Sequence, residues 1–238
     1  METSASCDNP VAVGPVHKIA LYDMDRTVTV TGTYSGFLMH IALALSPWRL
    51  IFLPLVPLVM LAYILRLIPR SRVKEWNQTL MIGHKVRRER LTSHLESYAD
   101  KVMAGNIRKG ALTQIAQDRA DGYHLVLATA SYRLYVEAIA RRLGFDTVIA
   151  TDHLSQDLTY LRARIAGENC YDEGKLRMIE AWMARHGIAR ATTHIRAYSD
   201  HVSDAPMLDF ADEPHAANPH KALARLAVEK GWPRIDWV

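Results

Sequence analysis

The sequence predicts an α/β protein, in which a parallel sheet carries helices on both faces and a mostly helical cap is inserted after the first strand. From residue 122 onward, short apolar runs alternate with segments of helical periodicity, a pattern typical of parallel strands joined by helices. Before that region, a strongly apolar block at 36–69 and charged helical segments at 73–121 interrupt the alternation. We therefore interpret these segments as the inserted cap.

The individual elements follow from their local patterns. The apolar run Ile19-Ala20-Leu21-Tyr22 predicts a buried strand, and the segment 17–30 contains this strand and the turn after it. Asp121-Gly122 marks the break before the alternating region. In that region we expect strands at 124–128, 147–150, 194–198, 215–217 and 234–237, helices at 132–143, 175–186, 205–210 and 221–230, and a hairpin arm at 160–166.

Composition limits the class of protein. The 238 residues suit one compact domain with an insert, and a hydrophobic content of 49% is ample for a core. Cys7 and Cys170 are far apart in the chain, so they indicate a reducing compartment and not a disulfide scaffold. Residues 1–15 lack the apolar stretch of a signal peptide, and we expect them to form a flexible tail.

The net charge of the chain limits the classes of partner that we expect it to bind. A formal net charge of +4 and an isoelectric point near 9.1 are compatible with an anionic substrate or an anionic membrane surface. No basic helix interleaved with aromatic residues stands out, so nucleic acid is not an expected partner. The oligomeric state is left open.

Two pairs of acidic residues follow predicted strands. Asp23 and Asp25 come directly after the first strand, and Asp200 and Asp204 follow the strand at 194–198. Ligands of open α/β sheets gather outside the carboxyl ends of the strands. Paired carboxylates there can hold a hard cation such as Mg²⁺, and one of them can attack a phosphorus atom. Taken singly, each pair also fits helix capping or a turn.

Two further motifs stand at predicted helix starts. Thr129 and Ser131 precede a helix, where a hydroxyl beside backbone N–H groups can hold a phosphate, although both are also ordinary capping residues. Lys175 begins another helix, at the end where the helix dipole disfavours a cation. This placement indicates a task such as neutralising a phosphate, and a solvated surface lysine is the alternative.

In this order, the four motifs resemble those of the haloacid dehalogenase-like (HAD) phosphohydrolases. The matching sequences are D-M-D-R-T at 23–27, T-A-S at 129–131, Lys175 and S-D-H-V-S-D at 199–204. Subfamily IB is similar in finer detail to G-E-N-C-Y-D-E-G-K at 167–175, A-Y-S-D-H-V-S-D-A-P-M-L at 197–208 and A-A-N-P-H-K-A-L at 216–223. The resemblance implies a HAD-like Rossmannoid core over 16–31 and 100–238, with a cap over 32–99.

The resemblance also implies a role for each catalytic residue. Asp23 would be the nucleophile that forms an aspartyl-phosphate, and Asp25 would protonate the leaving oxygen and then activate water. Thr129 and Lys175 would stabilise charge on the transferring phosphoryl group. Ser131 is the alternative hydroxyl, but Thr129 fits the end of the strand better.

A metal ion is part of the same implied mechanism. Mg²⁺ would be held by the Asp23 carboxylate, the Asp25 backbone carbonyl and Asp200, with Asp204 in support, and it would offset the repulsion between Asp23 and an anionic substrate. Arg26 departs from the family, which often has glycine at this position. It either adds a phosphate contact or points to solvent.

The apolar block at 37–65 exceeds what the lid of a soluble enzyme requires. The strands on either side of the block belong to one sheet, so a chain that crossed the membrane would have to cross it again to return. Two membrane spans need roughly 40 apolar residues, and this block is shorter than that. Pro54 and Pro57 are expected to interrupt a continuous helix. The basic residues that follow are Arg66, Arg70, Arg72 and Lys74. We expect a broken amphipathic hairpin lying in one leaflet with these residues at the headgroups, and a cap core or dimer interface is the alternative.

Three hypotheses about the substrate follow. The apolar segment is loosely similar to phosphatidylglycerophosphate phosphatases of the superfamily, which implies a Mg²⁺-dependent enzyme acting on a membrane lipid phosphate. Such an enzyme would be peripheral or monotopic at the cytoplasmic face of the membrane. The second hypothesis is a cytoplasmic phosphatase of a soluble metabolite, such as phosphoserine or histidinol phosphate. The third is a non-catalytic membrane adaptor, against which the complete set of acidic residues weighs.

Overall fold

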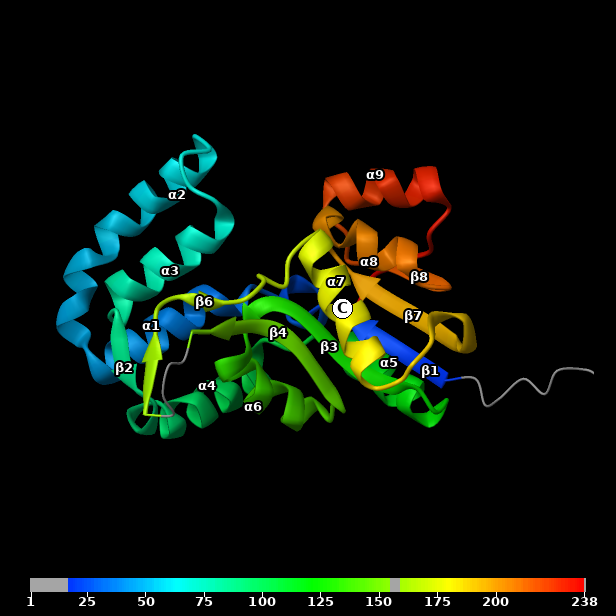
Figure 1. Cartoon of the computed structure of the whole chain (residues 1–238), viewed down its shortest axis with the longest axis horizontal. Helices are drawn as coiled ribbons and strands as arrows, with labels where there is room; N and C mark the ends of the chain where they lie inside the picture. Colours follow the sequence, from blue (N-terminus) through cyan, green and yellow to red (C-terminus); the bar gives the residue numbers. More distant parts are fainter. Residues whose placement is uncertain (1–16, 155–158, 238) are drawn as a thin grey trace, which may run out of the picture.

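The computed structural model describes residues 17–154 and 159–237, and the tail expected at 1–15 lies outside them. A seven-stranded sheet has the order β6-β4-β3-β1-β7-β8-β9 (Figure 1). Its strands are β1 (His17–Tyr22), β3 (His124–Tyr132), β4 (Thr147–His153), β6 (Ile165–Ala166), β7 (Thr193–Ser199), β8 (Glu213–Ala217) and β9 (Arg234–Ile235). Neighbouring strands are parallel except β6, which is antiparallel to β4.

Helices cover both faces of this sheet, as the sequence predicts for an α/β fold. Along β1, Ala20 and Tyr22 face one apolar core, whereas Ile19 and Leu21 face the other. The first core includes residues of α4 (Thr92–Gly105), α5 (Lys109–Ala120) and α6 (Arg133–Leu143). The second includes residues of α7 (Glu173–Arg185), α8 (Ala205–Phe210) and α9 (Lys221–Lys230). Both faces of β1 are therefore buried, which explains its continuous apolar run.

Two local expectations were wrong. β3 does not end at residue 128 but continues to Tyr132, with an irregular register against β4 between Thr129 and Tyr132. The segment 160–166 is not one hairpin arm, because β5 (Tyr160–Arg162) pairs with β2 (Lys85–Arg87) whereas β6 pairs with β4. The three-residue β2 depends on this remote partner, so no local pattern announces it.

The apolar block forms helices that stand at the side of the sheet. These are α1 (Thr33–Leu45), a 3₁₀ segment (Pro47–Leu55) and α2 (Val56–Ile64), followed by α3 (Arg70–Met81). The prolines do not break the run Pro47–Ile64, although its helix type changes from 3₁₀ to α at Val56. Pro57 lies in the first turn of α2, where its missing N–H costs little.

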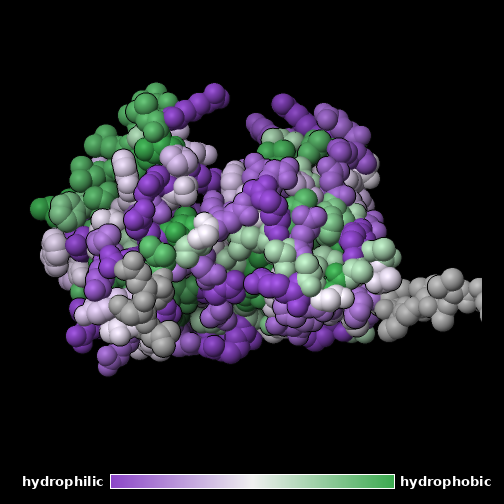
Figure 2. Space-filling model, in the orientation of Figure 1, coloured by the Kyte–Doolittle hydropathy of each residue, from purple (hydrophilic) through white to green (hydrophobic). Residues whose placement is uncertain are grey.

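We call residues Pro47–Ile64 the apolar run. It packs along α3, which separates it from the sheet in Figure 1. By length and composition it could cross a membrane, and 6% of its residues are buried inside the structure. Figure 2 shows hydrophobic residues gathered on this side of the molecule, over α2 and the segment before it. The apolar run is thus an exposed apolar surface held away from the catalytic strands by one helix.

Candidate active site

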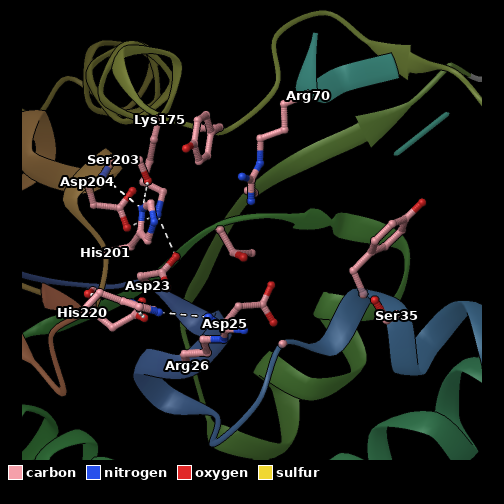
Figure 3. Close-up of a pocket in the computed structure, with 16 residues that line it drawn as sticks. Asp23, Asp25, Arg26, Ser35, Arg70, Lys175, His201, Ser203, Asp204 and His220 are labelled. Carbon is pink, nitrogen blue, oxygen red and sulfur yellow. Dashed lines mark hydrogen bonds and ion pairs between the residues drawn. The ribbon is translucent and has the colours of Figure 1, made fainter. Parts of the chain in front are cut away.

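The ends of the three central strands bring the predicted residues together. Asp23 follows β1, Thr129 lies in β3 and Asp200 follows β7, and these strands are neighbours in the sheet. Lys175 reaches the same place from the first turn of α7. All four line a pocket of about 350 Å³, shown in Figure 3. The structure thus brings one residue from each of the four motifs into the same pocket.

Lys175 is the centre of the ionic contacts in this pocket. Its Nζ atom lies 2.8 Å from Asp23 Oδ1 and 2.8 Å from Asp204 Oδ2, and its side chain is 2% exposed. Ser199 Oγ donates to the same Asp204 oxygen at 2.6 Å. A buried ammonium between two carboxylates has few alternative orientations. Lys175 is therefore held beside the carboxylate of Asp23.

Thr27 connects Asp23 with Asp200. Its hydroxyl lies 3.1 Å from Asp23 Oδ2 and 3.3 Å from Asp200 Oδ1, and it accepts the Asp200 N–H at 2.9 Å. On its other side, Asp200 Oδ2 lies 2.8 Å from Nδ1 of His220. Thus the carboxyl groups of Asp23 and Asp200 are close enough to share one hydroxyl donor.

Asp25 points away from this cluster, toward the first turn of α1. Its Oδ1 atom accepts the backbone N–H of Thr33 at 2.6 Å and the Thr33 hydroxyl at 2.7 Å. Its Oδ2 atom accepts the hydroxyl of Ser131 at 2.6 Å. The carboxylate thereby caps the start of α1, whose own N-cap residue, Gly32, has no side chain. The position of Asp25 is consequently tied to the first cap helix.

The two candidate hydroxyls have different partners. Ser131 is engaged with Asp25, whereas Thr129 Oγ1 accepts the Ser131 N–H at 3.1 Å and lines the pocket. An oxygen that accepts at this position still carries its own proton, which it can donate to a ligand. The geometry thus favours Thr129 as the hydroxyl that faces a substrate.

The buried charges shift one another's pKa. Burial raises the pKa of Asp23 to about 8, against the lowering effect of Lys175 and with Asp204 and Asp200 adding to the rise. Burial likewise raises the pKa of Asp200 to about 6, although His220 opposes this. Burial lowers the pKa of Lys175, but Asp204 and Asp23 outweigh it, so its pKa lies above the ordinary value. Additional positive charge would stabilise these carboxylates.

The donor chemistry of this cluster fits Mg²⁺. Asp23, Asp200 and Asp204 offer carboxylate oxygens within one pocket, and oxygen is the donor that Mg²⁺ prefers. The acids lie close together, because Thr27 contacts both Asp23 and Asp200 and Lys175 contacts both Asp23 and Asp204. Among residues 17–154 and 159–237, however, no three acidic, histidine or cysteine side chains already form a ligand set. The fit therefore rests on donor type and proximity.

Arg26 occupies a backbone conformation that favours glycine. Its φ angle is +67° and its ψ angle −7°, in the left-handed region. Its side chain turns to the pocket rim, where Nη1 donates to Nε2 of His220 at 3.0 Å (Figure 3). Of the two alternatives considered for Arg26, the structure thus favours a place beside the site.

Several other residues line the pocket without a role assigned from the sequence motifs. Three of them lie in the cap, outside every motif, and they are Tyr34, Ser35 and Arg70. The other four lie within the quoted motifs of the core, and they are Tyr171, His201, Ser203 and His220. Arg70 opens α3, and its guanidinium stacks 4.2 Å from the ring centre of Tyr171. Figure 3 shows this guanidinium pointing into the pocket. In the sequence, Arg70 is one member of a basic run, which masks its place at the site.

The structure contradicts the expectation that Lys74 lies at the membrane headgroups. It is 8% exposed, and its Nζ atom donates to the Ala130 carbonyl and to Asn169 Oδ1. Its burial is possible because these two oxygens replace water as acceptors. Lys74 therefore joins α3 to the segment between Thr129 and Ser131.

Comparisons with known proteins agree with this geometry. The sequence matches the haloacid dehalogenase-like hydrolase family over residues 20–209, and the chain belongs to this family. It is 35% identical over 146 residues to the phosphoserine phosphatase SerB1 of Mycobacterium tuberculosis, covering 60% of this chain and 45% of the relative. It is 28% identical over 200 residues to the protein CicA of Caulobacter vibrioides, covering 82% and 83% of the two chains.

The fold is also shared with a solved structure. A protein of unknown function from Bordetella pertussis Tohama I superposes with a TM-score of 0.82 at 27% identity, over 93% of this chain and 99% of its own. In contrast, the chain spans 42 to 45% of the length of several curated relatives, including the M. tuberculosis phosphatase. The family match and the structural similarity establish the family and the fold, whereas the activity of this chain depends on the chemistry of its own site.

Proposed function

We propose that the protein is a Mg²⁺-dependent phosphomonoester hydrolase that works through an aspartyl-phosphate. The observation that carries this proposal is the buried Asp23 carboxylate, held at 2.8 Å by Lys175 in a pocket that Thr129 also lines. Asp23 would attack phosphorus while the ester P–O bond breaks, and Lys175 and Thr129 would contact the phosphoryl oxygens as charge develops there.

Asp25 supplies the proton transfers in this scheme. It gives a proton to the leaving alcohol, and it then takes one from the water that attacks the aspartyl-phosphate and releases phosphate. Its three hydrogen bonds to Thr33 and Ser131 fix the carboxylate. Because Thr33 begins α1, the position of the acid depends on where the cap lies.

Mg²⁺ would be held by Asp23, the backbone carbonyl of Asp25 and Asp200, with Asp204 in support. When bound, it supplies positive charge that lets an anionic phosphate approach the Asp23 carboxylate. The acids would keep these positions through Thr27 and Lys175, which already contact two of them each.

The lining of the pocket favours a substrate whose leaving group is anionic and apolar, as in a membrane lipid phosphate such as phosphatidylglycerophosphate. On the cap side the pocket is lined by Gly32, Tyr34, Ser35 and Arg70, and no carboxylate is among them. Arg70 suits a second anionic group, whereas the ammonium of an amino-acid phosphate finds no acid there. The exposed apolar run ends a few residues before Arg70, so a membrane surface would lie near this rim. The enzyme would then act as a peripheral or monotopic protein on the cytoplasmic face.

A phosphatase of a soluble metabolite is the second candidate. It is favoured by the similarity to a relative named phosphoserine phosphatase. In that case the apolar run would cover a partner or a second copy of the chain. Activity on phosphoserine that exceeds activity on dispersed lipid phosphates would select this candidate.

The chemistry is tested with a small aryl phosphate, which needs no lipid. We expect hydrolysis by the wild type that EDTA stops and Mg²⁺ restores, and no turnover by Asp23→Asn, because an amide is a very poor nucleophile. Rapid quench should place the phosphoryl group on Asp23. Full activity without metal, or wild-type turnover by Asp23→Asn, would contradict the mechanism.

A further inference from the structure

A second pocket lies at the other end of the apolar run from Arg70. It has a volume of about 510 Å³ and is lined by Leu45, Ser46, Arg49, Ile82, Gly83, His84, Lys85, Val86, Arg87, Arg90 and Tyr160. We call it the basic pocket, since four of the described side chains that line it are Arg or Lys and none of them is acidic. It shares no residue with the catalytic pocket, so the mechanism proposed above does not use it.

Within 17–154 and 159–237, the positive charges of the basic pocket form no ion pair with a carboxylate. Among the described residues, Arg49, Lys85, Arg87 and Arg90 make no ion pair with an acid. Glu89, an acid next to Arg90 in sequence, does not line the pocket. Elsewhere, surface arginines such as Arg141 and Arg142 are matched by Glu96. An unmatched group of cations around a hollow favours an anionic ligand.

Several contacts hold these side chains in place. Lys85 and Arg87 lie on the same face of β2, and Lys85 Nζ stacks 3.7 Å from the ring centre of Tyr160 on β5. Arg49 Nη1 donates to the carbonyls of Thr79 and Leu80, at 2.8 and 3.1 Å, at the C-terminal end of α3. The pocket is therefore a structured part of the cap.

The basic pocket is continuous with the exposed apolar surface. Arg49 belongs to the apolar run itself, and its guanidinium lies 4.8 Å from the ring centre of Trp48. Trp48 is 63% exposed and Ile51 is 74% exposed. A ligand in the pocket would thus meet cations on one side and apolar side chains on the other, as the headgroup of a lipid does at the bilayer surface.

We propose that the basic pocket binds the phosphate headgroup of an anionic phospholipid and so fixes the apolar run flat on the membrane. This inference rests on the proposed membrane association but concerns a site separate from catalysis. The core is attached to both ends of the run, through α1 and through α3, and both ends carry basic residues. Cations at both ends suit a helix in the plane of the headgroups, with the catalytic pocket near one end.

The test compares two charge-reversed pairs. Lys85→Glu with Arg87→Glu alters the basic pocket, and Lys221→Glu with Arg225→Glu makes the same change on exposed positions of α9. Each basic residue at an anionic surface contributes about fivefold in binding, so losing two of them should weaken sedimentation with phosphatidylglycerol-containing vesicles by roughly 30-fold, and the two added carboxylates should weaken it further. The α9 pair should bind as the wild type does, and both pairs should hydrolyse the aryl phosphate normally.

The chemistry of the ligand is tested with the same proteins. A charge-preserving pair, Lys85→Arg with Arg87→Lys, should keep vesicle binding, and phosphatidylcholine vesicles should bind all proteins weakly. Glycerol 3-phosphate or inorganic phosphate should not displace the wild type at millimolar concentration. Equal losses in both charge-reversed pairs would mean diffuse attraction and overturn the site, as would displacement by free phosphate. Wild type that hydrolyses the aryl phosphate but never sediments would overturn this proposal and leave the catalytic one standing.

Discussion

At the scale of single residues, the end of β3 separates two hydroxyls that look alike in the sequence. Thr129 lines the catalytic pocket, and Ser131 donates to Asp25. A hydroxyl that donates to the transferring phosphoryl group stabilises the transition state. A hydroxyl that donates to Asp25 only helps to hold that carboxylate, which also accepts the backbone N–H and the hydroxyl of Thr33.

We therefore expect unequal effects of removing these hydroxyls. Thr129→Val should lower kcat on an aryl phosphate by about 100-fold, the usual effect of losing one such donor. Ser131→Ala should lower kcat by about tenfold or less, because Thr33 still holds Asp25. Steady-state kinetics of both variants, with circular dichroism as the folding control, decides the matter. A larger loss in Ser131→Ala would reverse the assignment.

The residues of this site differ in whether the sequence alone could predict them. Asp23, Thr129, Lys175 and Asp200 stand in short motifs beside strands or helix starts, so their types and spacing predict them and the sheet brings them together. Tyr34 and Arg70, by contrast, stand in no such motif, because their place at the site depends on how the cap meets the core.

At the scale of elements, α3 buries polar side chains toward the core. Lys74 donates to the Ala130 carbonyl, Glu75 accepts the Ile165 N–H at 2.9 Å, and Gln78 lies 2.8 Å from His153. Trp76, by contrast, is 45% exposed. A charged helix is ordinarily expected to face solvent, and here polar partners in the core reverse that expectation. The pairing of β2 with β5 could not be predicted from local patterns, since the two strands are remote in the chain, whereas β6 pairs with the nearby β4.

The burial of Lys74 predicts a pH-dependent stability. Burial, aided by nearby Arg70, lowers the pKa of Lys74 to about 7. Between this pKa and the unfolded value near 10.4, the unfolded chain binds the additional proton, so the residue's contribution to the free energy of unfolding rises with pH. Lys74→Met removes this slope. From pH 7 to pH 9, the wild type should therefore gain roughly 2 kcal/mol relative to the variant.

Urea unfolding at both pH values measures this gain. Lys221→Met, which removes an exposed lysine of α9, is the control and should follow the wild type at both pH values. A difference between wild type and Lys74→Met that stays constant with pH would show that Lys74 keeps its charge in the folded protein.

At the scale of the whole molecule, three tiers lie side by side. The catalytic sheet is followed by α3, and α3 by the apolar run (Figure 1). α3 touches both neighbours, since Lys74 and Gln78 reach the core while Trp76, Thr79 and Leu80 line an apolar groove with the run. The general fold was predictable because it follows from alternating patterns along the chain. The partner that covers the apolar run was not predictable, because a sequence shows that a surface is apolar but does not show what contacts it.

The outer tier yields the prediction that decides the substrate class. Ile51, Leu58, Leu61 and Ile64 are 49 to 74% exposed on the apolar run, so replacing them with serine should spare the fold. Each loses part of the 1.5–3 kcal/mol that full burial of such a side chain provides, so together they should weaken binding to anionic vesicles by at least about 100-fold. Activity on a lipid phosphate should fall with binding, whereas activity on an aryl phosphate should not.

Val228→Ser provides the control, since Val228 is 73% exposed on α9, in a different part of the molecule, and its loss should change neither activity. Salt should weaken wild-type binding without abolishing it, because the apolar contribution is not screened. The opposite pattern is equally informative. If the wild type stays in the supernatant at low salt, or if the serine variant loses both activities alike, the apolar run does not meet a membrane. The enzyme would then be assigned to soluble phosphomonoesters, with the run covering a partner or a second copy of the chain.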